Sequence, residues 1–156
     1  MKNMNKPSIL VICMGNICRS PTGEAVLRAK AKERGMDIDV DSAGTIGFHQ
    51  GSAPDSRSQR VGEQRGYSFA NIQSRKVESS DFERFGLILA ADKANLADLY
   101  DICPVEHQHK LALFLSYSSS DYSEIPDPYY GGDKGFDLVL DLIEEAADRL
   151  LDQLQN

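Results

Sequence analysis

The chain has 156 residues, with 24 acidic against 17 basic side chains and a formal net charge of −7. This length favours one domain, burying roughly 70% of the surface that the unfolded chain exposes. The acidic balance argues against a nucleic-acid-binding protein, because that affinity depends on basic side chains that neutralise phosphates. No run of residues approaches the ~20 apolar positions of a membrane span. Three cysteines do not suit a disulfide framework, and the apolar run after Pro7 is too short for a secretory signal, so we expect a cytoplasmic protein with reduced thiols.

The first third of the chain predicts a strand, a helix and a second strand. Ser8–Cys13 is a continuous apolar run, typical of a strand that is buried on both faces in a parallel sheet. A helix is expected over residues 21–34, with Ser20 as its N-cap and Gly35 at its end. Residues 38–42 alternate as a second strand. Together these elements predict a right-handed βαβ unit.

Short local signals predict the elements in the middle of the chain. Asp55 is the expected N-cap of a helix that ends at Gly66. Ser80 and Glu83 have the spacing of a capping box around a short helical turn. Residues 87–90 are expected to form a third buried strand.

The last part of the chain predicts two helices and a strand. Asp92 is the expected cap of a helix to about residue 100, and residues 110–113 are the expected fourth strand. Residues 116–135 have no periodicity, which favours a functional loop. The final helix has one apolar face, made of Phe136, Val139, Leu140, Ile143, Ala147, Leu150 and Leu154. We expect a single α/β domain over residues 1–156, with an open parallel four-stranded sheet of order 2-1-3-4 and helices on both faces.

The segment after the first strand has the composition of an anion-binding loop. Five residues separate Cys13 from Arg19, few enough to turn their backbone N–H groups towards one tetrahedral oxyanion. Gly15 is expected at a positive φ, and Asn16 is the residue other than glycine that best tolerates the left-handed region. The following helix N-terminus and the Arg19 guanidinium favour the thiolate form of Cys13. A thiolate beneath a bound phosphoryl group suits attack on phosphorus.

Two motifs resemble those of a known family. Residues 13–21, Cys-Met-Gly-Asn-Ile-Cys-Arg-Ser-Pro, resemble the phosphate loop of the low-molecular-weight protein tyrosine phosphatases. Residues 127–130, Asp-Pro-Tyr-Tyr, resemble the general-acid segment of that family. The similarity in length, motif order and spacing covers essentially the whole chain. The resemblance implies a cofactor-independent phosphatase that hydrolyses phosphotyrosine through a phosphocysteine on Cys13.

Breaking a phosphoester requires an acid for the leaving oxygen and later a base for the attacking water. From the residues alone, Asp121, Glu124, Asp127 and Asp133 are all candidates for this role. The resemblance selects Asp127, which stands between two prolines that restrict its backbone.

Other residues gain expected roles around these groups. Ser42 matches a family serine that supports Asn16, while Asp92 lies near the loop if strands one and three are neighbours. For Asp92 a role as helix cap is already sufficient, and support of the site is the alternative. Phe48 and Tyr129 are expected to wall a slot for an aromatic ring, unless they only pack their own loops. The expected phosphate ligands are Met14, Gly15, Asn16, Ile17, Cys18, Arg19 and Ser20, and Tyr130 completes the expected substrate pocket.

Three further positions refine the resemblance. Phosphoarginine phosphatases of this type carry Thr at the position of Ile17, so Ile17 favours an aryl phosphate. Cys18 could close a reversible disulfide with an oxidised Cys13, or be a small buried thiol. Several relatives have His where this chain has Ile72, which predicts a different bracing of Asn16.

Other functions compete with this interpretation. The expected partner is a phosphotyrosine-containing protein, with a tyrosine kinase as one candidate and inorganic phosphate as product. Arsenate reductases share this fold but need two further cysteines after the third strand, where this chain has Ala90 and Ala91. A non-catalytic phosphate-binding module is the third possibility. His107 and His109 without a third ligand are weak evidence for a metal, so no metal or cofactor is expected.

Overall fold

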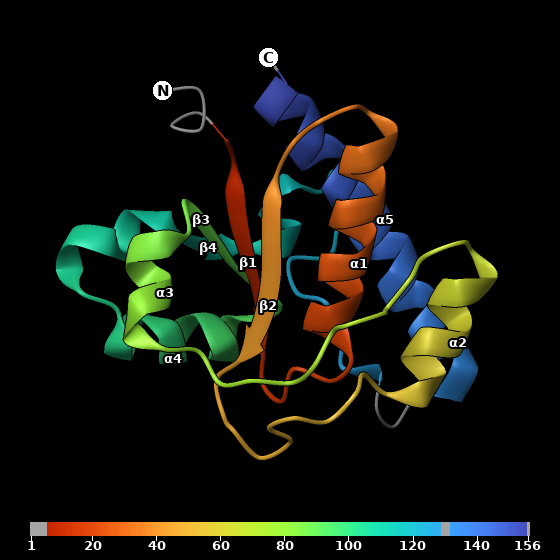
Figure 1. The fold of residues 1–156 in the computed structure, drawn as a ribbon, viewed down its shortest axis with the longest axis horizontal. Helices are drawn as coiled ribbons and strands as arrows, with labels where there is room; N and C mark the ends of the chain where they lie inside the picture. Colours follow the sequence, from red (N-terminus) through yellow and green to blue (C-terminus); the bar gives the residue numbers. More distant parts are fainter. Residues whose placement is uncertain (1–5, 129–131, 156) are drawn as a thin grey trace.

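Four parallel strands form one sheet in the computed structural model, which describes residues 6–128 and 132–155 (Figure 1). Val11 of the first strand lies opposite Ser42 on one side and Leu89 on the other. The strands are β1 (Ser8–Cys13), β2 (Asp39–Gly44), β3 (Leu87–Ala90) and β4 (Leu111–Leu113), in the order β2-β1-β3-β4. The predicted α/β class and strand order are confirmed, and the carboxyl ends of all four strands meet at one edge of the sheet.

Helices cover both faces of this sheet (Figure 1). On one side lie α1 (Arg19–Glu33) and α5 (Gly132–Gln155), with α2 (Ser56–Gln64) beside α5. On the other side lie α3 (Ser79–Arg84) and α4 (Lys93–Ile102). The 3-10 helices η2 (Val105–Lys110) and η3 (Phe114–Tyr117) flank β4. Within residues 6–128 and 132–155, no helix has the length and apolar character needed to cross a membrane.

The strand β1 separates two hydrophobic cores. Ile9 and Val11 belong to the core shared with α1 and α5, whereas Leu10 and Ile12 belong to the core shared with α3 and α4. All four side chains are fully buried. Each such burial stabilises the fold by roughly 1.5–3 kcal/mol as an upper figure. The carboxyl end of β1, where Cys13 lies, is therefore fixed from both faces.

Several predicted helix boundaries are confirmed. The Asp55 side chain accepts a hydrogen bond from the Arg57 backbone N–H at 2.8 Å, as an N-cap residue should. Gly35 and Gly66 have φ of 67° and 91°, the left-handed conformation that ends a helix.

Other boundaries differ from the predictions. The capping box of α3 uses Glu78 and Asp81 instead of Ser80 and Glu83, because the helix begins at Ser79 and Ser80 lies inside its first turn. The strand β2 continues to Gly44, which pairs with the last residue of β1. The segment expected to be aperiodic contains η3 at its start, and α5 begins at residue 132 instead of 136.

Candidate active site

The loop between β1 and α1, residues 13–19, is called the phosphate loop below, and Cys13 begins it. The Cys13 side chain is buried, and its Sγ lies 3.4 Å from the donating Ser20 backbone nitrogen and 3.0 Å from Ser20 Oγ. The predicted N-cap role of Ser20 is wrong. The helix begins at Arg19, with Cys18 in the N-cap position and no side-chain cap. The Ser20 hydroxyl contacts the sulfur instead of capping the helix.

Asn16 gives the phosphate loop its bend. Its φ is 57°, as predicted, and its side chain is fully buried. Asn16 Nδ2 donates to Ser20 Oγ at 2.7 Å and to Ser42 Oγ at 3.0 Å, so Ser42 supports the loop. The prediction of a positive φ at Gly15 is wrong, since Gly15 is not among the positive-φ residues. A side chain at Gly15 would instead meet the His49 ring, whose Cδ2 would lie 3.0 Å from its Cβ.

A second segment braces the loop from outside. The Arg75 backbone N–H donates to Asn16 Oδ1 at 3.0 Å, and Ser74 Oγ donates to the Gly15 carbonyl at 2.9 Å. Ile72 is buried in a small apolar cluster with Ala25 and Phe69. The bracing of Asn16 in this chain therefore comes from a main-chain donor and from serine, and Ile72 packs against α1.

Arg19 lies at the mouth of α1 and is nearly fully buried. Its Nη1 donates to Asp92 Oδ2 at 2.8 Å and to the Ile125 carbonyl at 2.9 Å. Asp92 also caps α4 by accepting from the Asn95 backbone N–H at 2.8 Å. Asp92 therefore caps α4 and also binds the Arg19 guanidinium, while its support of catalysis stays a prediction. Both of these Arg19 hydrogen bonds use Nη1.

Asp127 follows an anchored segment. The Ile125 backbone N–H donates to the Ala91 carbonyl at 2.8 Å, and the Ile125 side chain is buried in the core. Glu124 Oε2 accepts from the Lys93 backbone N–H at 2.8 Å, so this carboxylate is used at the start of α4. These contacts fix the chain two residues before Asp127, which lies at the surface and lines the same cavity as Cys13.

A cavity of about 300 Å³ opens over the phosphate loop. It brings together the sulfur, the guanidinium and the carboxyl group that were predicted to act together. Its lining consists of Cys13, Met14, Gly15, Ile17, Cys18, Arg19, Phe48, His49 and Asp127. The candidate site therefore places a thiol, a guanidinium and a carboxyl group around one space.

The rim of this cavity has an aromatic side. Phe48 is 82% exposed, and its ring meets that of His49 edge to face at a centroid distance of 5.0 Å. Phe48 lines the cavity, and its role as a wall for an aromatic ring stays a prediction. His49 is a lining residue that the sequence did not reveal, because nothing local distinguishes it from a loop histidine. Tyr129 and Tyr130 lie outside the described residues.

Cys18 lines the same cavity as Cys13. Burial raises the pKa of the Cys18 thiol to about 12, and the nearby Asp55 carboxylate contributes to the rise. Cys13, Cys18 and Cys103 are all free thiols. Cys18 is therefore a neutral thiol at physiological pH, and its predicted redox role stays a prediction.

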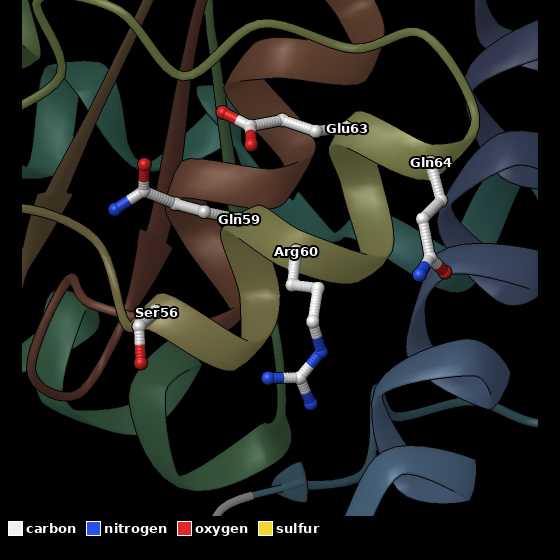
Figure 2. A pocket seen from close by; sticks show the side chains of 5 residues that line it. All are labelled: Ser56, Gln59, Arg60, Glu63 and Gln64. Atoms are coloured by element: carbon white, nitrogen blue, oxygen red, sulfur yellow. The ribbon is translucent and has the colours of Figure 1, made fainter.

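A second hollow lies along α2 (Figure 2). Its side chains project in different directions from a single helix, and it contains no thiol. The lining residues are Ser56, Gln59, Arg60, Glu63 and Gln64. The thiol, guanidinium and carboxyl group of the predicted chemistry line the cavity over the phosphate loop instead.

Comparison with known proteins decides the family. The family model described as "Low molecular weight phosphotyrosine protein phosphatase" matches residues 8–156. The chain belongs to this family. YfkJ of Bacillus subtilis, a low molecular weight protein-tyrosine-phosphatase, is 36% identical over 151 residues, covering 95% of this chain and 96% of that protein. The Schizosaccharomyces pombe low molecular weight phosphotyrosine protein phosphatase is 38% identical over 141 residues, covering 87% of this chain and 90% of that protein.

Solved structures of low molecular weight phosphatases agree with this assignment. The Entamoeba histolytica protein tyrosine phosphatase, crystallised with Hepes in its active site, has a TM-score of 0.92 and 40% identity, covering 96% of this chain and 97% of that chain. The crystal structure of YfkJ has a TM-score of 0.90 and 35% identity, covering 96% and 95% of the two chains. This protein is accordingly a protein-tyrosine phosphatase, a hydrolase of phosphoric monoesters.

Proposed function

We propose that this phosphatase uses Cys13 as its nucleophile, Arg19 as its phosphate-binding cation and Asp127 as its general acid and base. The main support is that these three residues line one cavity at the N-terminus of α1. The helix N-terminus and the loop N–H groups favour an anion there, both as thiolate and as phosphate. The Nε and Nη2 edge of Arg19 suits two phosphoryl oxygens at once.

In the first step the Cys13 thiolate attacks phosphorus, forming an S–P bond as the bond to the leaving oxygen breaks. Asp127 gives its proton to that oxygen, so the alcohol leaves neutral. Arg19 and the loop N–H groups stabilise the charge on the three equatorial oxygens. In the second step Asp127 takes a proton from water, which attacks phosphorus, breaks the S–P bond and releases inorganic phosphate.

The proposed substrate group is phosphotyrosine on a protein. Phe48 and Ile17 give the cavity an apolar side that fits a flat ring. The structure of Vibrio vulnificus Wzb, which is 32% identical with a TM-score of 0.84, contains benzylphosphonate, a phosphorus group on an aromatic ring. A tyrosine kinase is one proposed protein substrate. The proposed location is the cytoplasm, because its reducing conditions suit an active thiolate.

Hydrolysis of phosphotyrosine and of p-nitrophenyl phosphate tests the mechanism. Cys13→Ser should abolish turnover of both, and Asp127→Asn should lower the rate with phosphotyrosine by ~10²–10⁴. The loss of kcat/KM for Asp127→Asn should be smaller with p-nitrophenyl phosphate, because p-nitrophenolate is a weaker base than tyrosinate and needs less protonation. Acid quenching of the wild type during turnover should trap phosphate on Cys13.

Asp121→Asn is the matched control, because Asp121 is an exposed carboxylate in the same segment and does not line the cavity. It should retain wild-type rates. An equal loss of kcat/KM with both substrates in Asp127→Asn would remove the acid role from Asp127, because kcat/KM reports the step in which the leaving oxygen is protonated. A wild type that turns over phosphoarginine, or reduces arsenate with thiols, in preference to phosphotyrosine would overturn the proposed substrate.

A further inference from the structure

A chain of hydrogen bonds leads from Cys13 through the interior to a glutamate on α1. Ser20 Oγ lies 3.0 Å from Cys13 Sγ and accepts from Asn16 Nδ2 at 2.7 Å. The same Asn16 nitrogen donates to Ser42 Oγ at 3.0 Å. Ser42 Oγ in turn donates to Glu24 Oε1 at 2.6 Å. The chain thus begins at a sulfur and ends at a carboxylate.

Glu24 lies in an unusual place for a charged side chain. It is 5% exposed, on the inner side of α1, and its second oxygen accepts from Arg28 Nη2. Arg28 also donates to the Val40 carbonyl at 2.8 Å. Burial raises the pKa of the Glu24 carboxyl, while the hydrogen bonds from Ser42 and Arg28 oppose that rise. Because burying a carboxylate costs free energy even when it is paired, its presence here requires a reason beyond packing.

The ionised carboxylate can only accept hydrogen bonds, which determines the direction of the first link. Ser42 has one hydroxyl proton, and donating it to Glu24 leaves Ser42 only lone pairs for Asn16. The amide nitrogen of Asn16, which can only donate, must therefore face Ser42. The Arg75 backbone N–H, which requires an acceptor, fixes the amide oxygen on the opposite side.

The direction of these hydrogen bonds decides whether the Ser20 hydroxyl can donate its proton to the Cys13 sulfur. With the Asn16 nitrogen facing Ser20, the Ser20 oxygen accepts and its one proton is free to be donated. Its possible acceptors are Cys13 Sγ at 3.0 Å and the Ala43 carbonyl at 3.4 Å, and the sulfur is the closer. A flipped Asn16 amide would take the Ser20 proton for itself and leave the thiolate without this donor.

We propose that Glu24 is a positioning residue for Cys13, acting as the fixed acceptor at the far end of a hydrogen-bond chain that ends on the sulfur. This inference rests on the proposed function, in which Cys13 reacts as a thiolate. Glu24 acts through Ser42, and the pair with Arg28 keeps the carboxylate in its accepting form.

Alkylation of Cys13 by iodoacetate, followed by mass spectrometry across pH, tests the proposal directly. In Glu24→Gln the pH midpoint of Cys13 alkylation should rise by ~0.5–1 unit, the equivalent of one weakened hydrogen bond to the thiolate. The value of kcat/KM for p-nitrophenyl phosphate at acidic pH should fall ~3–10-fold for the same reason, because kcat/KM reports the ionisation of the free enzyme. Glu33→Gln removes an equal charge from an exposed position of α1 and should leave both quantities unchanged.

A double-mutant cycle tests whether Glu24 acts through Ser42. Ser42→Ala alone should raise the alkylation midpoint as Glu24→Gln does, and the double variant should show no further rise. Additive shifts would mean that Glu24 influences Cys13 by another route. If Glu24→Gln does not fold, Glu24→Asp keeps the charge but withdraws the carboxylate from Ser42 by one methylene, and it should raise the midpoint as well.

An unchanged alkylation midpoint combined with a lower unfolding temperature would show that Glu24 only stabilises the fold, and the inference would be wrong. Because alkylation needs no turnover, this failure differs from failure of the proposed function. The latter would appear as an inactive wild type, or as a Cys13→Ser variant that is still active.

Discussion

Gly44→Ala is the substitution that most directly tests how β2 supports the phosphate loop. A Cβ at Gly44 would lie 2.6 Å from the Met14 carbonyl oxygen, 3.1 Å from the Ile46 carbonyl oxygen and 3.2 Å from the Asn16 nitrogen. Gly44 cannot easily move away from the loop, because two backbone hydrogen bonds hold it. Its N–H donates to the Arg75 carbonyl at 2.8 Å, and its carbonyl accepts from the Val77 backbone N–H. The phosphate loop must therefore move.

The size of the effect follows from these distances. A Cβ atom essentially never lies within 3.0 Å of a backbone atom to which it is not bonded. The Met14 carbonyl must therefore shift by about half an ångström or more. Overpacking of this kind costs ~1–3 kcal/mol of unfolding free energy. A displacement of about 1 Å at a reacting site can cost ~10²-fold in rate, so kcat/KM for p-nitrophenyl phosphate should fall ~10–100-fold.

Urea unfolding and steady-state kinetics measure the two effects on the same protein. Gly47→Ala is the matched control, because the nearest atom to a Cβ there is Lys76 Cβ at an ordinary 3.7 Å. It should change neither stability nor rate by a comparable amount. A Gly44→Ala variant with wild-type kcat/KM would refute the reasoning, since the loop would then tolerate a displacement that the site geometry does not allow.

Two further predictions concern groups beside the loop. Asp92→Asn should lower the unfolding free energy by ~1–3 kcal/mol, because it keeps the α4 cap but leaves buried Arg19 without its anion, and Asp92 is only 22% exposed. Asp92→Ala also loses the cap and should cost ~1 kcal/mol more in urea unfolding; equal losses would contradict the cap. Iodoacetate at pH 7 should spare Cys18, since a pKa of about 12 keeps it protonated. Its modification, followed by mass spectrometry, should rise about tenfold per pH unit towards 12, and rapid modification at pH 7 would contradict this.

Local rules succeeded where the signal lies within a few residues. The apolar run of β1 has the predicted bounds, and Asp55 and Asp92 are the helix caps that their positions indicate. The left-handed conformation of Asn16 follows from the tolerance of its side chain for that region. Elements of this kind are determined by periodicity, capping and turn preferences.

The same rules failed where distant residues compete for a group. Ser20 has the sequence context of an N-cap, yet its hydroxyl contacts Cys13 and Asn16. Gly15 has an ordinary φ, and the space above it is occupied by the His49 ring, which comes from another loop. Neither the contacts of Ser20 nor the conformation of Gly15 can be predicted from the adjacent residues. Each depends on atoms of other residues that the fold brings into contact.

The sequence by itself determined the parallel sheet and the family and predicted the chemical groups of the site, because periodicity and two short motifs carry these signals. Only the tertiary structure decided how the groups are held. The closeness of Gly44 to the loop backbone and the burial of Glu24 at the end of a hydrogen-bond chain depend on segments that meet only after folding. Hydrogen bonds and steric contacts between such segments have no local sequence pattern, so their roles become visible only once the distances are known.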